Sequence, residues 1–238
     1  MNKLNCDVIC IICARGGSKG LADKNLRLLD GEALVARAVK HAFESNSIGS
    51  VIVSTDSIQI ADVAKKAGAE IPFLRPSEIA NDLTTTEVTL QHALNEYEQL
   101  SNKKFSIGVF LTATDIFRNP SWITQAIFKL RSNPDLDSVF VGYPTHKNYW
   151  EQLETGEWIR LRDWMSTYSS RQIRKYIVRE DTGLACASRA ELWRQGRRIG
   201  DKVDIILNED SFSSIDIHSI EDLKLAEAAL ALRKAYGK

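Results

Sequence analysis

The sequence reads VICIICA at residues 8–14 and RGGSKGLADKN at residues 15–25. The first run is apolar throughout, which is typical of a strand that is buried on both faces of a sheet. The second run combines three glycines with the positive charges of Arg15, Lys19 and Lys24. Glycines let backbone amides approach an anion, and open α/β sheets bind ligands at the carboxyl ends of their strands. Residues 14–25, the basic loop, therefore predict a triphosphate site, although a solvated basic turn would have the same composition.

The rest of the chain alternates short β-branched runs with longer amphipathic segments, which predicts an α/β fold: a three-layer, mostly parallel sheet with helices on both faces. Further strands are predicted at residues 51–55, 70–74, 105–111, 138–143, 182–188 and 213–217. Helices are predicted at residues 32–45, 58–67, 84–100, 120–130, 190–195 and after residue 219. Thr84 with Glu87, and Ser219 with Asp222, have the spacing of capping boxes at two of these helices.

Residues from about 143 to 180 interrupt this alternation for longer than a simple connection would. They predict an inserted arm within a single domain of residues 1–238. The arm carries large aromatic side chains that it is too short to bury alone, so we expect it to form a homodimer. These side chains are Tyr149, Trp150, Trp158, Trp164 and Tyr168.

Composition excludes several classes of protein. Lys+Arg 31 and Asp+Glu 31 give a net charge of zero, so no nucleic acid or membrane partner is expected. No apolar stretch reaches the ~18 residues of a membrane span, and residues 1–10 lack the order of a secretory signal, so we expect a cytoplasmic protein. Cys10 and Cys13 lie three apart on a strand and should point to opposite faces, which argues against a zinc site. With Cys6 and Cys186 isolated, all four cysteines are expected to be free thiols.

Three segments together resemble the acylneuraminate (CMP-sialic acid and other nonulosonic acid) cytidylyltransferase family. They are ARGGSKGLADKN at 14–25, VIVSTDSIQIADVAKKAGAEIPFLRPSEIANDLTTT at 51–86 and SIDIHSIEDLKLAE at 214–227. The resemblance implies a nucleotide-diphospho-sugar transferase type of fold with a dimerisation arm. It also implies transfer of CMP from CTP to a nine-carbon sugar acid, with release of pyrophosphate.

The same resemblance implies roles for individual residues. The catalytic set would be Arg15, Lys19, Lys24 and Asp216. The nucleotide would be bound by Ala14, Gly16, Gly17, Ser18, Asn25, Arg75 and Thr84. The sugar acid would be bound by Thr112, Thr114, Arg171 and Gln172, followed by Arg179 and Gly183. Arg75 could instead be a surface charge, the threonines helix caps, and Arg171 and Arg179 charges of the arm.

The sequence departs from the family pattern where a metal is expected. The family's late Asp-x-Asp is here Asp216-Ile217-His218. On a strand these two side chains would point to one face and could hold one divalent ion, Mg²⁺ or Mn²⁺. Alternatively, His218 only packs at the final helix while Asp216 holds Mg²⁺. Asp115 is a second candidate carboxylate, or a loop cap.

Other functions remain open at this stage. The chain could be a 3-deoxy-manno-octulosonate cytidylyltransferase, a glycosyltransferase that uses a nucleotide sugar, or a catalytically inactive binding member of the family.

Overall fold

The computed structural model describes residues 6–170 and 172–236. Within them, seven strands form one sheet: β1 Val8–Cys13, β4 Ser50–Ser54, β5 Ile107–Thr112, β6 Ser138–Thr145, β9 Ile177–Glu180, β10 Cys186–Arg189 and β11 Val203–Leu207. The strand order is β11-β6-β10-β5-β1-β4, and β9 pairs with β6. β1 is parallel to β4 and β5, and β6 is parallel to β11, whereas β9 and β10 run antiparallel to their neighbours. The sheet is mixed and mostly parallel.

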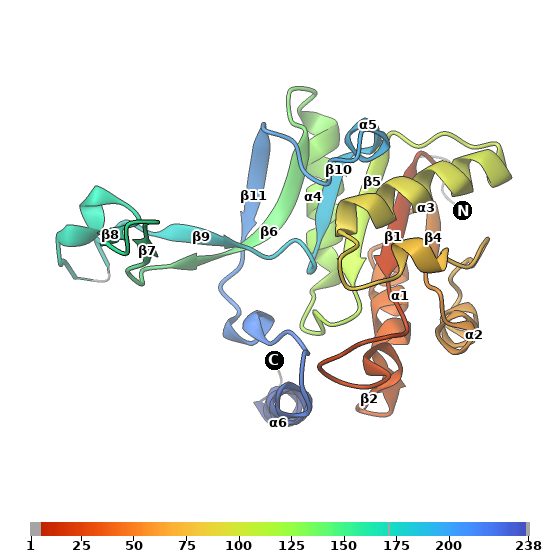
Figure 1. Cartoon of the computed structure of the whole chain (residues 1–238), viewed down its shortest axis with the longest axis horizontal. Helices are drawn as coiled ribbons and strands as arrows, with labels where there is room; N and C mark the ends of the chain where they lie inside the picture. The colour runs from red at the N-terminus through yellow and green to blue at the C-terminus, as the bar shows by residue number, and fades with distance from the viewer. Residues whose placement is uncertain (1–5, 171, 237–238) are drawn as a thin grey trace.

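Helices cover both faces of this sheet (Figure 1). They are α1 Leu34–Glu44, α2 Ile58–Lys66, α3 Thr86–Ser101, α4 Pro120–Ser132, α5 Ala190–Arg194 and α6 Ile220–Tyr236. Alternate residues of β1 join two separate cores, because successive side chains of a strand point to opposite faces. Cys10 packs into the core formed with α1 and α4, whereas Ile9 and Ile11 pack against α3 and α5. These two cores establish the predicted three layers.

The cysteines of β1 behave as predicted. Cys10 lies in the core on the α1 side, and Cys13 packs against the core on the α3 side. Cys10, Cys13 and Cys186 are free thiols. Burial raises the pKa of the Cys13 thiol to about 11 and that of Cys186 to about 12. These buried, protonated thiols therefore pack as small apolar side chains.

Two predicted strands are wrong. The segment 70–74 is reduced to one bridge between Glu70 and Ile52, because Pro72 has no N–H to continue the ladder. The segment 213–217 contains the end of a 3₁₀ helix, Ser211–Ser214, which Asp210 caps by accepting the N–H of Phe212. Asp216 then makes an isolated antiparallel bridge to Asp115.

Two further strand boundaries differ from the prediction. The segment 182–188 forms a strand only from Cys186, because the N–H of Leu184 closes a turn onto the carbonyl of Asp181. No strand is predicted at 203–207, where β11 forms. Asp204 breaks this apolar run, and its carboxylate pairs with Lys129 at 2.7 Å on an edge strand.

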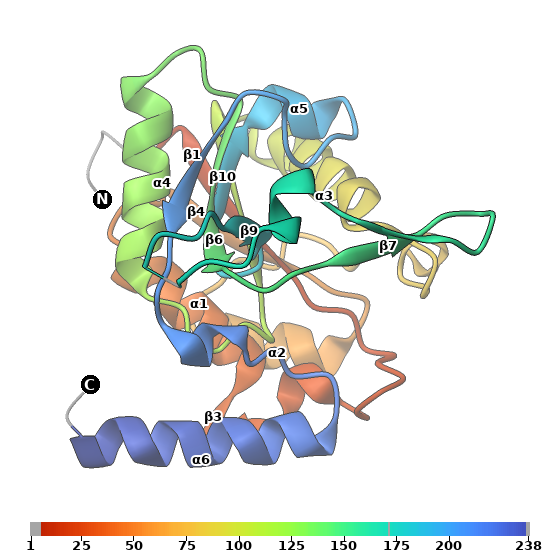
Figure 2. The same ribbon diagram turned by 90° about the vertical axis from the view of Figure 1, so that its left-hand side faces the viewer.

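One of the two predicted capping boxes is confirmed. The N–H of Ser219 donates to Asp222 Oδ2 at 2.8 Å, and the N–H of Asp222 donates to Ser219 Oγ at 3.2 Å. At α3 the cap is Thr85, whose Oγ1 accepts the N–H of Val88 at 3.4 Å, so the prediction of Thr84 is one residue too early. Figure 2 shows α6 running along the end of the molecule that carries the hairpin of β2 Leu28–Leu29 and β3 Glu32–Ala33.

The interruption at residues 143–180 projects away from the sheet as an arm built on β6 and β9 (Figure 1). It includes the short hairpin of β7 Trp150–Gln152 and β8 Trp158–Arg160 and the 3₁₀ turn Asp163–Ser166. Trp158 and Tyr168 are 59% and 72% exposed, which leaves much of the arm's aromatic surface uncovered in a single chain.

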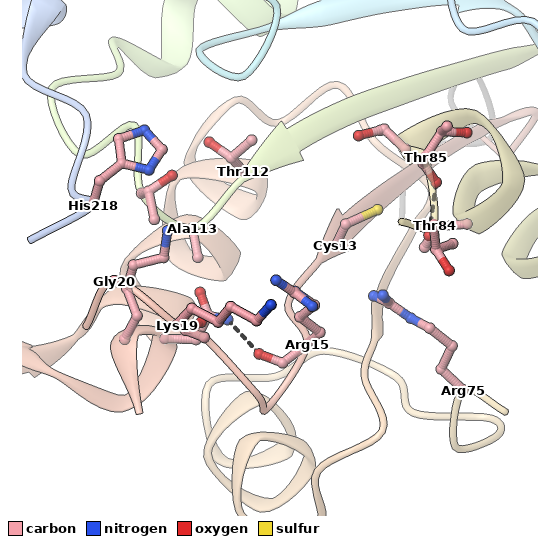
Figure 3. Close-up of a pocket in the computed structure, with 16 residues that line it drawn as sticks. Cys13, Arg15, Lys19, Gly20, Arg75, Thr84, Thr85, Thr112, Ala113 and His218 are labelled. Carbon is pink, nitrogen blue, oxygen red and sulfur yellow. Dashed lines mark hydrogen bonds between the residues drawn. The ribbon is translucent and has the colours of Figure 1, made fainter. Parts of the chain in front are cut away.

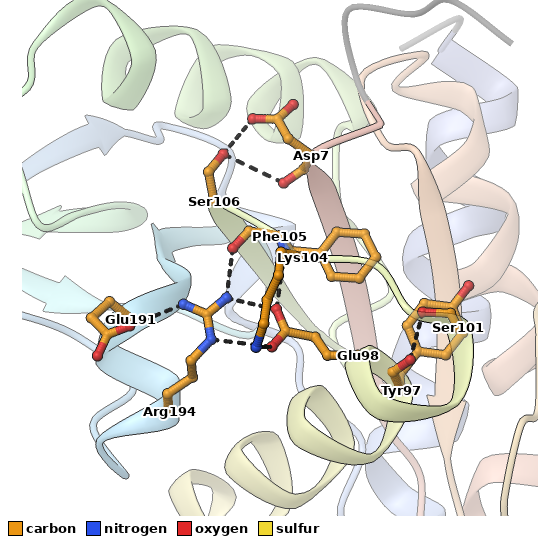
Figure 4. A network of polar contacts seen from close by, with 9 residues as sticks. All are labelled: Asp7, Tyr97, Glu98, Ser101, Lys104, Phe105, Ser106, Glu191 and Arg194. Atoms are coloured by element: carbon orange, nitrogen blue, oxygen red, sulfur yellow. Dashed lines mark hydrogen bonds and ion pairs between the residues drawn. The ribbon is translucent and has the colours of Figure 1, made fainter.

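One polar network ties α3 to α5 and to the start of β5 (Figure 4). The carboxylate of Glu98 is almost fully buried and accepts hydrogen bonds from Arg194, from Lys104 and from the N–H of Phe105. Burial by itself raises the pKa of Glu98, but these donors outweigh it and lower the pKa to about 2. Glu98 is therefore ionised, and its ion pairs and hydrogen bonds connect α3 to α5 and to the start of β5.

In the described part of the chain, no helix is both long enough and apolar enough to cross a membrane.

Candidate active site

A cavity of about 370 Å³ opens at the carboxyl ends of β1 and β5 (Figure 3). The basic loop contributes Arg15, Ser18, Lys19, Gly20, Lys24 and Asn25 to its lining. The opposite wall includes Thr112 and Ala113 of the β5 end and the threonines that begin α3. This is the edge of the sheet at which the sequence predicts a ligand.

Three contacts hold the basic loop in place. The N–H of Gly16 donates to Asp56 Oδ1 at 2.8 Å, and the side-chain amide of Asn25 donates to the carbonyl of Arg15 at 2.9 Å. At Gly20 a Cβ would lie 2.5 Å from the carbonyl oxygen of His218, so only glycine allows this approach. Of the predicted nucleotide contacts, Ala14, Gly16 and Gly17 do not line the cavity, and the Gly16 amide already has a partner. The loop thus presents side chains to the cavity more than amides.

Arg75 is a buried member of this cationic wall. Its side chain is fixed by Ser54, because Nε donates to Ser54 Oγ at 3.0 Å and Nη2 donates to the Ser54 carbonyl. Burial lowers the pKa of Arg75, as it does that of Lys24. A buried arginine that lines a cavity is not a surface strand-end charge, so that alternative reading of Arg75 is wrong.

The carboxylate of Asp82, from another segment of the chain, contacts two cations of the basic loop. Asp82 Oδ1 contacts Arg15 Nη2, and Asp82 Oδ2 lies 2.5 Å from Lys19 Nζ. These two cations lower the pKa of Asp82. Beside it, Asn81 Oδ1 accepts the backbone N–H of Thr84 at 3.0 Å, and Thr84 itself lines the cavity. The segment that follows Arg75 is therefore held against the basic loop by charge.

A second cavity, of about 420 Å³, adjoins the first and shares Thr86 and Thr112 with it. Its charged lining includes Asp115, Arg179, Glu180, Asp181, Arg198 and Asp216. Arg179 is paired through two nitrogens with both oxygens of Asp181, at 2.6 and 2.9 Å. Arg198 has longer ion pairs. Its Nη2 lies 3.3 Å from Glu180 Oε1, and its Nε lies 3.5 Å from Glu87 Oε1. This Nε is buried and makes no hydrogen bond within the described residues. A ligand could extend from one cavity into the other past the two shared threonines.

A buried arginine organises the boundary between the cavities. Arg118 is 4% exposed and donates to the carbonyls of Thr112 at 2.8 Å and Gly183 at 2.6 Å, and also to that of Leu184. It joins the end of β5 to the turn before β10. At Gly183 a Cβ would lie 1.9 Å from Asp115 Oδ2, so a larger residue here would displace the Asp115 carboxylate.

Asp115 and Asp216 meet at this boundary. Thr112 Oγ1 donates to Asp115 Oδ2 at 2.5 Å, and burial together with the charge of Asp216 raises the pKa of Asp115 to about 6. Asp216 Oδ2 lies 2.8 Å from His218 Nε2, whereas Asp216 Oδ1 is buried without a hydrogen-bond partner among the described residues. The strand that was expected to align Asp216 with His218 does not form, yet the two side chains are in contact.

Two mutually repelling carboxylates and an unsatisfied buried oxygen are suited to a hard divalent cation. The described residues contain no group of three or more His, Cys, Asp or Glu side chains that could hold a metal by themselves. Mg²⁺ is usually bound by one or two carboxylates together with substrate phosphates, so this donor set fits it.

Only some of the remaining predicted sugar contacts line the cavities. Thr112 lines both cavities, and Thr114 lines the first. Gln172 lies on the arm, lines neither cavity and accepts a hydrogen bond from Ser170. Arg171 lies outside the described residues.

Two residues of this region, Arg118 and Arg198, were not predicted from the sequence. Arg118, three residues beyond Asp115, could have been noticed by its spacing. Nothing in the local sequence predicts that either guanidinium turns inward.

A family model described as cytidylyltransferase matches residues 9–234. The post-translational flagellin modification protein B of Campylobacter coli is 25% identical to this chain over 222 residues, 93% of this chain and 94% of that protein. The CMP-N,N'-diacetyllegionaminic acid synthase of Legionella pneumophila is 38% identical over 120 residues, 50% of this chain and 51% of that protein. The match thus spans about half the length of the synthase.

Solved structures share the fold. A CMP:2-keto-3-deoxy-manno-octonic acid synthetase complexed with CTP covers 95% of this chain and 99% of its own, with a TM-score of 0.69 at 13% identity. The 4-diphosphocytidyl-2C-methyl-D-erythritol synthase from Anaerococcus prevotii covers 94% and 98%, with a TM-score of 0.65 at 15% identity.

Proposed function

Since the chain belongs to the cytidylyltransferase family, we propose that it transfers CMP from CTP to the anomeric hydroxyl of a nonulosonic, sialic-type acid and releases pyrophosphate. The names of relatives at 33–38% identity, including legionaminic, pseudaminic and acylneuraminic acid enzymes, support this class of acceptor. The observation that carries the proposal is the pair of adjoining cavities, one cationic and one lined by carboxylates and arginines, joined at Thr86 and Thr112.

The first cavity is suited to the nucleotide. Arg15, Lys19 and Lys24 line it and would surround the triphosphate, and the buried Arg75 lines it as well. Phosphoryl transfer depends on positioning and charge neutralisation more than on covalent help from the protein. These side chains would stabilise the negative charge that develops on the departing pyrophosphate.

The second cavity is suited to the sugar acid. Among the described residues, Nε of Arg198 makes no hydrogen bond and has only the looser contact with Glu87 at 3.5 Å, whereas the guanidinium of Arg179 is already engaged with Asp181. We assign the acceptor carboxylate to Arg198, since a guanidinium pairs well with a carboxylate. Thr112, at the junction, would hold the anomeric end of the acid close to the α-phosphorus. The hydroxyl oxygen then attacks phosphorus in line, the bond to the β-phosphate breaks, pyrophosphate leaves with the bonding electrons, and the hydroxyl proton passes to solvent.

Asp115 and Asp216 would hold a divalent cation at the boundary between the cavities. When bound, Mg²⁺ or Mn²⁺ would neutralise phosphate charge and polarise the α-phosphoryl group. His218 would orient Asp216 through its contact with Oδ2, and Oδ1 would then be available to bind the ion. This arrangement favours an orienting role for His218 over direct ligation.

We also propose that residues 1–238 act as one domain and that the arm forms a homodimer. The exposed aromatic side chains of the arm support this assembly, because large uncovered apolar patches on a small chain usually mark an interface.

A substrate panel tests the proposed reaction. The purified chain is incubated with CTP, Mg²⁺ and each of several nonulosonic acids, together with the eight-carbon acid 3-deoxy-manno-octulosonate, and pyrophosphate release is measured. Release with a nine-carbon acid supports the proposal. Release with the eight-carbon acid alone, or with none of the acids, contradicts it.

A further inference from the structure

Asp82 is an anionic side chain that contacts two residues of a cavity whose charged lining is cationic. Each of its carboxylate oxygens contacts a different cation: Oδ1 faces Arg15 and Oδ2 faces Lys19. The Asp82 side chain is about one third exposed, so it is accessible to solvent. Both of its partners line the cavity.

The contacts of the Asp82 carboxylate resemble those that a phosphate group would make with the same two cations. Two oxygens of one anion meet one guanidinium and one ammonium group, as two non-bridging oxygens of a phosphate would. A bound triphosphate needs the same two cations, and its charge would repel a carboxylate that remained beside them. The two anions therefore compete for one place.

We propose that Asp82 competes with a phosphate group of the nucleotide for Arg15 and Lys19 and must leave both when a triphosphate binds, so that it lowers the affinity for CTP. The inference rests on the proposed function, which assigns the triphosphate of CTP to Arg15 and Lys19. Exposed ion pairs of this kind contribute little to folding, which allows the exchange to occur without loss of structure.

The departure of Asp82 also has a structural consequence. Asp82 lies between Asn81, whose side chain holds the N–H of Thr84, and the threonines that line the cavity. Release of the carboxylate frees this segment from the basic loop. Phosphate binding is thereby coupled to the position of Thr84.

Calorimetric titration of the full chain tests the competition. Wild type, Asp82→Asn and Asp82→Ala are each titrated with CTP and, separately, with inorganic tripolyphosphate at low ionic strength. We expect both variants to bind both ligands about 5- to 10-fold more tightly than wild type, the size of effect that removing one nearby like charge produces. Asp82→Ala is included because an asparagine at position 82 still carries an oxygen that can accept a hydrogen bond from Arg15.

Glu78→Gln is the matched control. It removes one negative charge from the same segment, yet within the described residues no cation lies within ion-pair distance of Glu78. We expect its affinities to stay within about twofold of wild type. Equal or weaker binding by both Asp82 variants, or an equal gain in Glu78→Gln, overturns the proposal.

The tripolyphosphate series separates this inference from the proposed function. Tighter tripolyphosphate binding by the Asp82 variants supports the role of Asp82 even if no sugar acid releases pyrophosphate. Normal pyrophosphate release with unchanged affinities in these variants overturns the role of Asp82 and leaves the proposed function intact.

Discussion

Asp115 and Asp216 are paired across an isolated antiparallel backbone bridge, which brings two carboxylates from distant parts of the chain to the boundary between the two cavities. The charge of Asp216 adds to burial in raising the pKa of Asp115. Such a pair is costly unless a cation or a proton compensates it.

We therefore expect metal binding to depend on both residues. Asp216→Asn and Asp115→Asn should each lower kcat/KM about 10²- to 10³-fold, the loss that follows removal of one preorganised charge-stabilising group. Binding of Mn²⁺ in the presence of CTP, measured by electron paramagnetic resonance, should weaken in both variants.

The variant His218→Asp should keep the wild-type preference between Mg²⁺ and Mn²⁺, because His218 orients Asp216 rather than binding the ion. A change of preference would identify His218 as a ligand.

Lys19→Ala should reduce kcat/KM for CTP by about 10²-fold, or roughly 3 kcal/mol of transition-state stabilisation. The reason is that Lys19 supplies one of three basic-loop charges at the cavity. Pyrophosphate release measures the effect, and Lys66→Ala, at the far end of α2, is the control. Wild-type kcat/KM in the Lys19 variant would contradict a role in triphosphate binding.

Arg198→Ala should raise KM for the sugar acid about tenfold or more and leave KM for CTP nearly unchanged, because the lost contact is to the acceptor carboxylate. Its neighbour Arg197 pairs with Asp201 and lines neither cavity, so Arg197→Ala is the control. Steady-state kinetics with each substrate varied in turn distinguishes the two effects. An unchanged KM for the acid would remove Arg198 from the acceptor site.

The arm should form a homodimer at micromolar concentration. Trp158→Glu places a charge on its exposed aromatic surface and should shift the chain towards monomer, since burying an unpaired charge at an interface is unfavourable. Light scattering coupled to size-exclusion chromatography measures the mass of each form. Monomeric wild type would rule the assembly out.

Glu98 should make stability depend on acid pH. Its folded-state pKa of about 2 lies below the value of an unfolded glutamate, so the stabilisation is complete above about pH 4.5 and is lost as pH falls towards 2. At pH 7 the shift corresponds to about 3 kcal/mol, so Glu98→Gln should be destabilised by a similar amount. Urea unfolding at pH 7 and pH 3 should show a smaller difference from wild type at the lower pH. Glu191→Gln, an exposed partner of the same Arg194, should show little effect at either pH.

Local sequence patterns were sufficient to predict the layered α/β fold. The continuous apolar run of β1, the capping box at Ser219 and the Gly-rich basic loop are short-range signals, and each acts within a few residues of the chain. The predicted strand at 70–74 failed because one proline ended a ladder that local apolarity favoured. β11 was missed because pairing with β6, rather than its own pattern, makes it a strand.

By itself, the sequence determined the mostly parallel α/β fold, the position of the basic loop at a strand end and the membership in a cytidylyltransferase family. Only the tertiary structure decided which charges meet. The pairing of Asp82 with the basic loop, the inward turn of Arg118 and Arg198, and the meeting of Asp115 with Asp216 all join segments that are far apart in the chain. The physical reason is that secondary structure follows from local backbone and side-chain preferences, whereas the contacts of a charged side chain depend on which distant segments the packed core brings within a few ångströms of it.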